Sequence, residues 1–285
     1  TQPNTLFPYT TLFRSVATRR TRSALTQVKH VLPDDVVSDF RQRFAWLGQV
    51  TGPTRDLDVF LLELPRYRAS LPVAMANDLD ILAVHLRAAE RVAQQKLKRE
   101  LGSVQMRTLL DDWHAVLDAD EPPGEPGWFA DLPVERVAGR RIWRMYRKVL
   151  KDGRAVFSGG HAEDMHALRK DCKKLRYLIE FFRGLYPQPA LKGIIRALKD
   201  LLDNLGEFQD LEVQADTLRG FAREIADQES DSLSTVLAIG ALVADLLRRQ
   251  QAAHERFAGC FSAFDTPDNR AQYKALFKSG DPQQG

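Results

Sequence analysis

Long apolar runs are missing from this sequence of 285 residues. No stretch approaches the roughly 20 apolar residues that a membrane-spanning helix requires, and the N-terminus lacks the apolar core of a secretory signal. Only two cysteines occur, Cys172 and Cys260. One disulfide is compatible with that number, but reduced thiols in a cytosolic protein fit isolated cysteines better. We therefore expect a cytoplasmic chain that has no membrane segment.

Catalytic signatures are missing as well. The sequence contains no Walker loop, no HExxH, no zinc-type Cys/His spacing and no GxSxG. We therefore expect no enzymatic activity, no cofactor and no metal. Alternating strand patterns are also lacking, whereas apolar residues recur at helical spacing along most of the chain. The predicted fold class is all-α.

A basic helix is predicted over residues 166–180. Apolar residues on one side of it, such as Leu168, Cys172 and Leu175, would face a core. Four cations spaced i, i+3, i+7 and i+10 share the other face: His166, Arg169, Lys173 and Arg176. Like charges on one helix face repel each other, so stability alone does not favour this row. A solvated basic face is the plainer reading, and an anion-binding face is the alternative.

The same residue types recur at a constant offset of 154 positions. Lys173, Lys174 and Arg176 correspond to Arg19, Arg20 and Arg22. The segment QDLEV at residues 209–213 corresponds to RDLDV at residues 55–59, and a Leu-Gly pair precedes each segment. We therefore predict a duplicated unit of about 150 residues.

The predicted organisation follows from this repeat. We expect a non-native or disordered leader at 1–15, a first helical repeat at 16–118, a Pro/Gly linker at 119–132, a second repeat at 133–265 and a C-terminal tail at 266–285, of which the last fifteen or so residues are frayed. Within the repeats we expect a turn at 51–54, a helix end at Pro65, and a break between helices at 190–205 and 209–228.

The leader does not fit the repeat. Its stretch LFPYTTLFRS has no helical period and resembles translated adaptor sequence. At the offset of 154, His166 and Arg169 correspond to Leu12 and Ser15. We therefore expect that a first helix and the opening of the second helix are missing from the first repeat.

A second basic stripe lies on the predicted helix at residues 133–157. Its cations are spaced by three or four residues: Arg136, Arg140, Arg144, Arg147 and Lys151. Ser158-Gly159-Gly160 should turn the chain back, so this helix should pack antiparallel to the helix that carries His166. Although the net charge is only +3, residues 16–30 and 131–183 together carry about +11 and the rest about −8. Such segregation attracts polyanions.

These motifs resemble the CHAD domain (conserved histidine α-helical domain) over residues 16–265. The resemblance rests on H-x-x-R-K-x-x-K-K-x-R-Y in the second half, R-R-x-R-S-x-L in the first half and the paired L-G…R-D-L-D-V. It implies a two-fold helical repeat, with four to six helices in each unit, whose basic faces line a central groove or pore. It also implies that this surface binds inorganic polyphosphate, with recruitment to polyphosphate granules.

The candidate binding residues combine both copies and both basic helices. They are Arg19, Arg20, Arg22, Arg140, Arg144, His166, Arg169, Lys173, Lys174 and Arg176. Arginine pairs two phosphate oxygens at once, whereas lysine adds a mobile point charge. Such a surface would hold a phosphate chain without reading any sequence. The expected partner is polyphosphate, with no specific nucleic acid and no membrane; the oligomeric state is open.

Two alternatives remain at this stage. The acids at residues 56, 58, 210 and 212 hold a metal ion in a phosphate-processing site, or they act structurally as helix N-terminal acids or as partners that orient the basic residues. We favour the structural role. The chain as a whole is a polyphosphate-binding module, an accessory domain of a phosphohydrolase system, or a generic polyanion and nucleic-acid binder.

Overall fold

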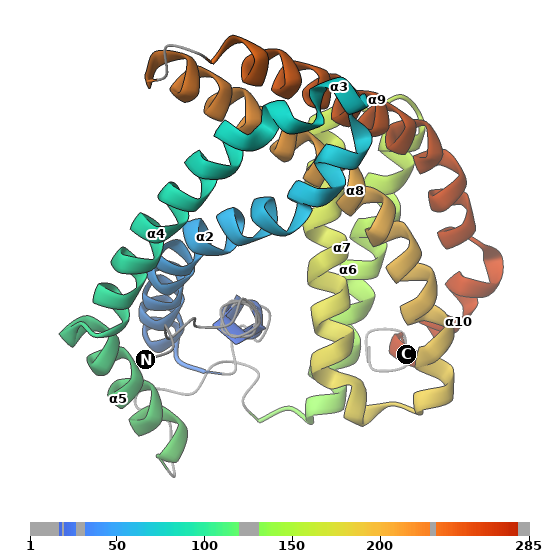
Figure 1. The fold of residues 1–285 in the computed structure, drawn as a ribbon. Coiled ribbons are helices and arrows are strands. Elements are labelled where there is room, and N and C mark those ends of the chain that lie inside the picture. The colour runs from blue at the N-terminus through green and yellow to red at the C-terminus, as the bar shows by residue number, and fades with distance from the viewer. Residues whose placement is uncertain (1–16, 19, 27–31, 120–130, 229–231, 279–285) are drawn as a thin grey trace. The chain divides into compact units, whose positions relative to one another are not determined.

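The computed structural model describes residues 17–18, 20–26, 32–119, 131–228 and 232–278. Throughout these ranges the regular elements are helices and no strand occurs, which confirms the all-α prediction. Figure 1 shows α2 (Asp34–Ser70), α3 (Val73–Ala76), η1 (Asn77–Leu79), α4 (Asp80–Leu101), α5 (Val104–Asp118), α6 (Val134–Phe157), α7 (Ala162–Phe182), η2 (Arg183–Leu185), α8 (Gln188–Gln228), α9 (Leu233–Phe264) and α10 (Pro267–Phe277). Within the described ranges, none of these helices is long and apolar enough to cross a membrane.

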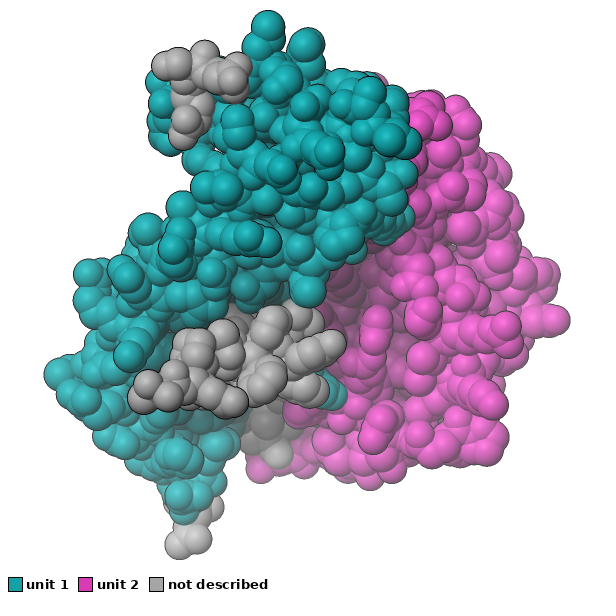
Figure 2. Space-filling model, viewed as in Figure 1, with its two compact units in different colours: residues 1–127, 214–245 teal, residues 128–213, 246–285 magenta. Residues whose placement is uncertain are grey.

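The chain forms two compact units, which Figure 2 colours separately. Unit 1 comprises residues 1–127 and 214–245, and unit 2 comprises residues 128–213 and 246–285. The first part of α8 therefore belongs to unit 2 and its last part to unit 1, and α9 is divided in the opposite order. The predicted leader and most of the predicted linker lie outside the described residues.

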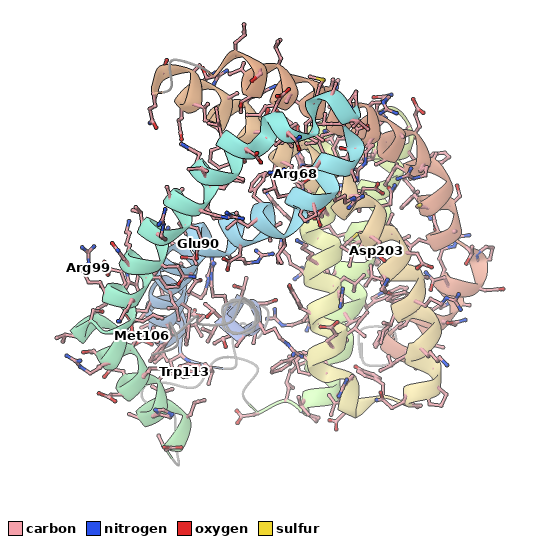
Figure 3. All side chains as sticks on the ribbon, in the orientation of Figure 1. Arg68, Glu90, Arg99, Met106, Trp113 and Asp203 are labelled. Carbon is pink, nitrogen blue, oxygen red and sulfur yellow. The ribbon has the colours of Figure 1, made fainter. Side chains whose placement is uncertain are left out.

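Aromatic rings form the part of the unit 1 core that holds the N-terminal basic segment. Trp113 of α5, labelled in Figure 3, lies 4.8 Å from Phe40 and 5.3 Å from Phe44 between ring centroids. Residues 20–26 are helical, and their Leu25 is buried in the same cluster. The apolar side of this short basic segment is thus anchored on α2 and α5, and its Arg20 and Arg22 remain exposed.

The predicted turn at residues 51–54 and the predicted helix end at Pro65 are both wrong, because α2 runs through Pro53 and Pro65 without interruption. A proline inside a helix costs about 3 kcal/mol, since it removes one hydrogen bond and crowds the preceding turn. However, α2 buries large side chains on both sides of Pro53, among them Phe44 and Phe60. Burial of one such side chain contributes about 1.5–3 kcal/mol, so packing outweighs the local preference.

The predicted break between helices at 190–205 and 209–228 is wrong as well, because α8 is continuous across Gly206. A helical glycine costs only about 1 kcal/mol relative to alanine. Leu205, Phe208 and Leu211 are all buried and keep the same apolar face across the glycine. Uninterrupted burial therefore carries the helix through the Leu-Gly pair.

Unit 2 places the two basic helices side by side. α6 and α7 pack against each other, and the short connection between them confirms the predicted antiparallel arrangement. Gly159 in that connection has a φ of 106°, a conformation that favours glycine. The apolar faces meet in a core that includes Ile142, Leu168 and Cys172, each with no exposed surface.

The last fifteen or so residues were expected to be frayed, which is wrong for residues 271–277, because they belong to α10 (Pro267–Phe277). The Thr266 hydroxyl accepts a hydrogen bond from the backbone N–H of Asn269 and caps this helix. Tyr273 is fully buried, and its ring stacks on Tyr146 of α6 with centroids 3.7 Å apart. α10 thus closes the core of unit 2 against α6.

Candidate functional site

α6 presents a dense row of cations because its apolar residues lie on one side. Val137, Ile142 and Tyr146 are buried, as the helical period predicts. The five cations of the predicted stripe, Arg136, Arg140, Arg144, Arg147 and Lys151, are all exposed. Burial lowers the pKa of Arg141, an arginine of the same helix outside the stripe, and the neighbouring charge of Arg144 lowers it further. The positive charges therefore lie close enough to perturb one another.

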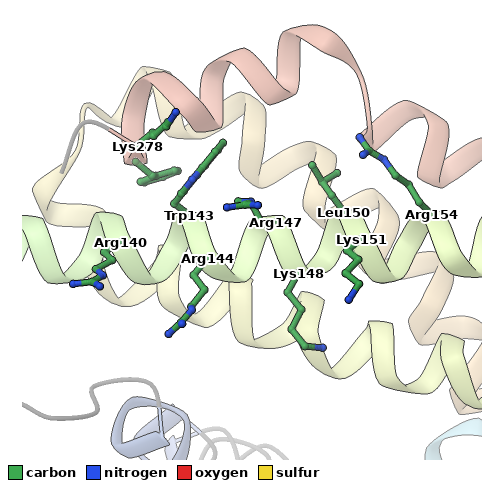
Figure 4. A pocket seen from close by; sticks show the side chains of 10 residues that line it. Arg140, Trp143, Arg144, Arg147, Lys148, Leu150, Lys151, Arg154 and Lys278 are labelled. Atoms are coloured by element: carbon green, nitrogen blue, oxygen red, sulfur yellow. The ribbon is translucent and has the colours of Figure 1, made fainter. Parts of the chain in front are cut away.

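A pocket of about 1040 Å³ lies along this part of α6. Figure 4 shows its lining: Arg140, Trp143, Arg144, Arg147, Lys148, Leu150, Lys151, Arg154, Phe277 and Lys278. Seven of these ten residues are lysine or arginine, and no carboxylate is among them. In Figure 4 Arg140, Arg144, Lys148 and Lys151 extend from one side of α6, whereas Trp143 extends from the other side, toward Lys278. The surface is suited to an extended anion.

Sequence reasoning predicted Arg140 and Arg144 in this surface but missed Lys148 as a member. The available signal was spacing, because Lys148 follows Arg144 by four residues and precedes Asp152 by four. Lys278 gave no such signal, because α10 brings it to α6 only through tertiary packing.

Asp171 is a buried carboxylate that contacts one lysine of each basic helix. Its side chain is only 6% exposed, and it accepts hydrogen bonds from Lys148 of α6 and, at 2.7 Å, from Lys174 of α7. Burial alone would raise the pKa of Asp171, but the two lysine hydrogen bonds outweigh burial and leave that pKa below its ordinary value. A buried, ionised Asp171 therefore holds the two ammonium groups near the α6–α7 seam.

α7 carries the predicted row that contains His166. The Asp164 side chain accepts a hydrogen bond of 2.8 Å from the backbone N–H of His161 and secures the start of this helix. Leu168, Cys172 and Leu175 face the core, as predicted. The helix is therefore fixed in rotation, and its row of cations is turned away from the core.

The α7 row differs from the α6 row because α8 supplies acids to it. His166 Nε2 lies 2.8 Å from Glu212 Oε2, which makes an ion pair when the imidazole is protonated. Arg169 Nη2 donates to Asp210 Oδ1 at 2.8 Å. Among the described residues, neither His166 Nδ1 nor Arg169 Nε has a hydrogen-bond partner, although both atoms are buried.

These contacts bear on the acids at residues 210 and 212. Both acids lie in the interior of α8 and not at its N-terminus, so the prediction that they are helix N-terminal acids is wrong. They contact basic residues of α7, in agreement with the prediction that they are partners of the basic residues. In the part of the chain that the structure describes, no group of three or more His, Cys, Asp or Glu is arranged to hold a metal ion.

The remaining predicted residues fall into separate places. Arg176 pairs with Glu180 of its own helix at 2.6 Å, and Lys173 is half-buried. Arg20 and Arg22 belong to unit 1, where the Arg22 guanidinium lies next to Gly48. A Cβ at Gly48 would come within 3.1 Å of Arg22 Nη1, so this glycine makes room for the guanidinium. Arg19 lies outside the described residues.

Comparisons with known proteins agree with this architecture. A model of the CHAD domain family matches residues 15–219. The crystal structure of the CHAD domain from the plant Ricinus communis is 25% identical in sequence, with a TM-score of 0.68, and the match covers 94% of this chain and 82% of that chain. PptA from Streptomyces chartreusis is 19% identical, with a TM-score of 0.67 and 90% of each chain covered, a likeness of fold. No curated protein matches the chain.

Proposed function

The chain belongs to the CHAD domain family, which is associated with polyphosphate and triphosphate binding, and we propose that it binds inorganic polyphosphate without hydrolysing it. In this proposal the polyphosphate is held by the cations of α6 and α7 in unit 2, together with Arg19, Arg20 and Arg22 of the first repeat. Binding of this kind would recruit the protein to polyphosphate granules.

One observation carries the proposal. Among the described residues, Arg144, Arg147 and Lys151 have no carboxylate partner, yet they lie on consecutive turns of one helix and line one pocket. Cations gathered without acids raise the free energy of the folded protein, and an anionic ligand removes that cost. A linear polyphosphate carries a negative charge on each repeating unit, so it matches a row of this kind along its length.

The duplication forms part of the proposal. α2 begins at residue 34 and α8 at residue 188, which is the same offset of 154 that relates the sequence motifs. Both are long helices that continue through a Leu-Gly pair. These bounds support two copies of one helical unit, each of which would contribute cations to a central groove.

The test is binding of long-chain polyphosphate at several salt concentrations. The variant Arg144→Ala/Arg147→Ala/Lys151→Ala is compared with the wild type and with a control, Arg87→Ala/Arg91→Ala/Lys98→Ala, which removes three exposed cations from α4. If the three α6 cations contact phosphates, the slope of log affinity against log salt should decrease by about 2, by analogy with single-stranded nucleic acid. At low salt we expect about 10- to 100-fold weaker binding, from three contacts of about 0.5–1 kcal/mol each.

Each other outcome has a defined meaning. Equal losses in the α6 variant and the α4 control would show that only net charge matters. Equal competition by single-stranded DNA of matched charge would reduce the function to generic polyanion binding. Release of phosphate from the bound chain would contradict the non-enzymatic proposal and favour a phosphohydrolase.

A further inference from the structure

The two basic helices of unit 2 differ in how their cations are neutralised. On α6, Lys148 and Arg154 contact carboxylates, but Arg144, Arg147 and Lys151 have no carboxylate partner among the described residues. On α7, by contrast, Arg169 and His166 already contact carboxylates that come from α8. Polyphosphate binding alone does not account for carboxylates that contact the cations of a binding surface.

Resting on the proposed function, we infer that Asp210 and Glu212 of α8 are internal counterions of the α7 row, which a polyphosphate chain displaces when it binds there. They thereby set the affinity of this row. Arg169 and Asp210 lie on different helices and are 41 residues apart in sequence, so their contact is made by the fold and not by local helix geometry.

Exposure indicates that the acids can be displaced. The Asp210 side chain is 62% exposed and that of Glu212 is 33% exposed, whereas the side chains of Arg169 and His166 are 18% and 23% exposed. The Glu212 Oε2 that faces His166 is itself buried. A released Asp210 carboxylate can therefore move directly into water, whereas Glu212 must turn its buried oxygen outward, toward the exposed part of its side chain. The cations are held more firmly and stay in place to receive phosphate oxygens. Asp171 is different, because its buried carboxylate is fixed between two lysines and has no route to solvent of this kind.

The size of the effect follows from the strength of such pairs. A partly exposed ion pair contributes about 0.2–1 kcal/mol, so displacing the Arg169–Asp210 pair and, when His166 is protonated, the His166–Glu212 pair weakens ligand binding by about 2- to 30-fold. Removing both carboxylates should therefore strengthen polyphosphate binding by the same factor. If the acids instead positioned Arg169 and His166 for phosphate, their removal would weaken binding. The two roles therefore predict opposite signs.

The experiment compares Asp210→Asn/Glu212→Gln with Asp203→Asn/Glu207→Gln. The second pair also removes two negative charges from α8 within unit 2, but its acids contact Lys199 and Arg256, which lie outside both basic rows. Affinity for long-chain polyphosphate is measured for both variants and for the wild type at one salt concentration. Circular dichroism and thermal denaturation establish that each variant is folded.

We expect Asp210→Asn/Glu212→Gln to bind about 2- to 30-fold more tightly than the control variant. The charge-conserving variant Asp210→Glu/Glu212→Asp should stay close to the wild type, since each acid remains within reach of its cation. Weaker binding, or a gain no larger than that of the control, would overturn the inference.

Binding of polyphosphate by the wild type tests the proposed function. The ratio of the affinities of Asp210→Asn/Glu212→Gln and Asp203→Asn/Glu207→Gln tests the inference. Binding by the wild type without a specific gain in the variant would overturn only the inference. Binding by the variant alone would support strong internal counterions. No binding by any of the proteins would overturn both.

Discussion

Replacing Asp58 by asparagine should stabilise unit 1 at neutral pH. Asp58 lies on α2 and is 8% exposed. Burial, and next the charge of nearby Glu90, raise the pKa of Asp58 from 3.8 to about 6. The ionised form present at neutral pH therefore destabilises the folded chain. The sequence offers an explanation, because Asp58 corresponds at the offset of 154 to Glu212, whose partner His166 corresponds to the uncharged Leu12.

The sign of the pH dependence follows from the direction of this shift. Because the pKa of Asp58 is higher in the folded state, the folded state binds the proton more tightly. Stability should therefore increase as the pH falls from about 7 through 6 toward 4, and the full destabilisation is present above about pH 7. This rise in the pKa of Asp58 corresponds to about 3 kcal/mol. Because water reaches part of the carboxylate, we expect about 1–2 kcal/mol.

Thermal denaturation of the wild type and Asp58→Asn between about pH 5 and pH 8 measures this effect. At the upper pH the melting temperature of the variant should be higher by about 2–8 °C, and the difference should shrink to roughly half of that at the lower pH, because Asp58 of the unfolded chain still ionises there. Asp111→Asn, which neutralises an exposed acid of α5 in the same unit, serves as the control for net charge. A variant that melts at or below the wild-type temperature at the upper pH, or a gain that does not depend on pH, would refute the reasoning.

Two further predictions concern the packing of unit 2. Gly153→Ala should lower the free energy of unfolding by about 1–3 kcal/mol, because the new Cβ would lie 2.0 Å from the buried ring of Phe261. Gly259→Ala should instead stabilise the helix by up to about 1 kcal/mol, because the space around that position is open. Chemical denaturation measures both, and equal effects at the two glycines would contradict the packing argument. Cys172 should not react with a thiol reagent in the native protein, because burial raises its pKa, whereas partly exposed Cys260 should react. Titration with Ellman's reagent should then find one reactive thiol natively and two in denaturant, and rapid native labelling of Cys172 would show that the core opens.

Local patterns in the sequence determined the helical character of the chain, because the 3.6-residue period depends only on which residues are neighbours along one helix. This is why the buried and exposed faces of α6 and α7 were predicted from residues such as Ile142, Arg144 and Leu168. The family was also accessible from sequence, since the paired basic and acidic motifs recur in register.

Only the tertiary structure decided where helices continue and which charges meet. Proline and glycine at positions 53 and 206 predict local ends, but burial on both sides of each residue exceeds the local cost, and that burial depends on distant helices. The pairing of Arg169 with Asp210, and the shared contact of Lys148 and Lys174 with Asp171, also join residues from different helices. Because an ion pair depends on distance in space and not on spacing in sequence, the division into partnered and unpartnered cations became visible only in the folded chain.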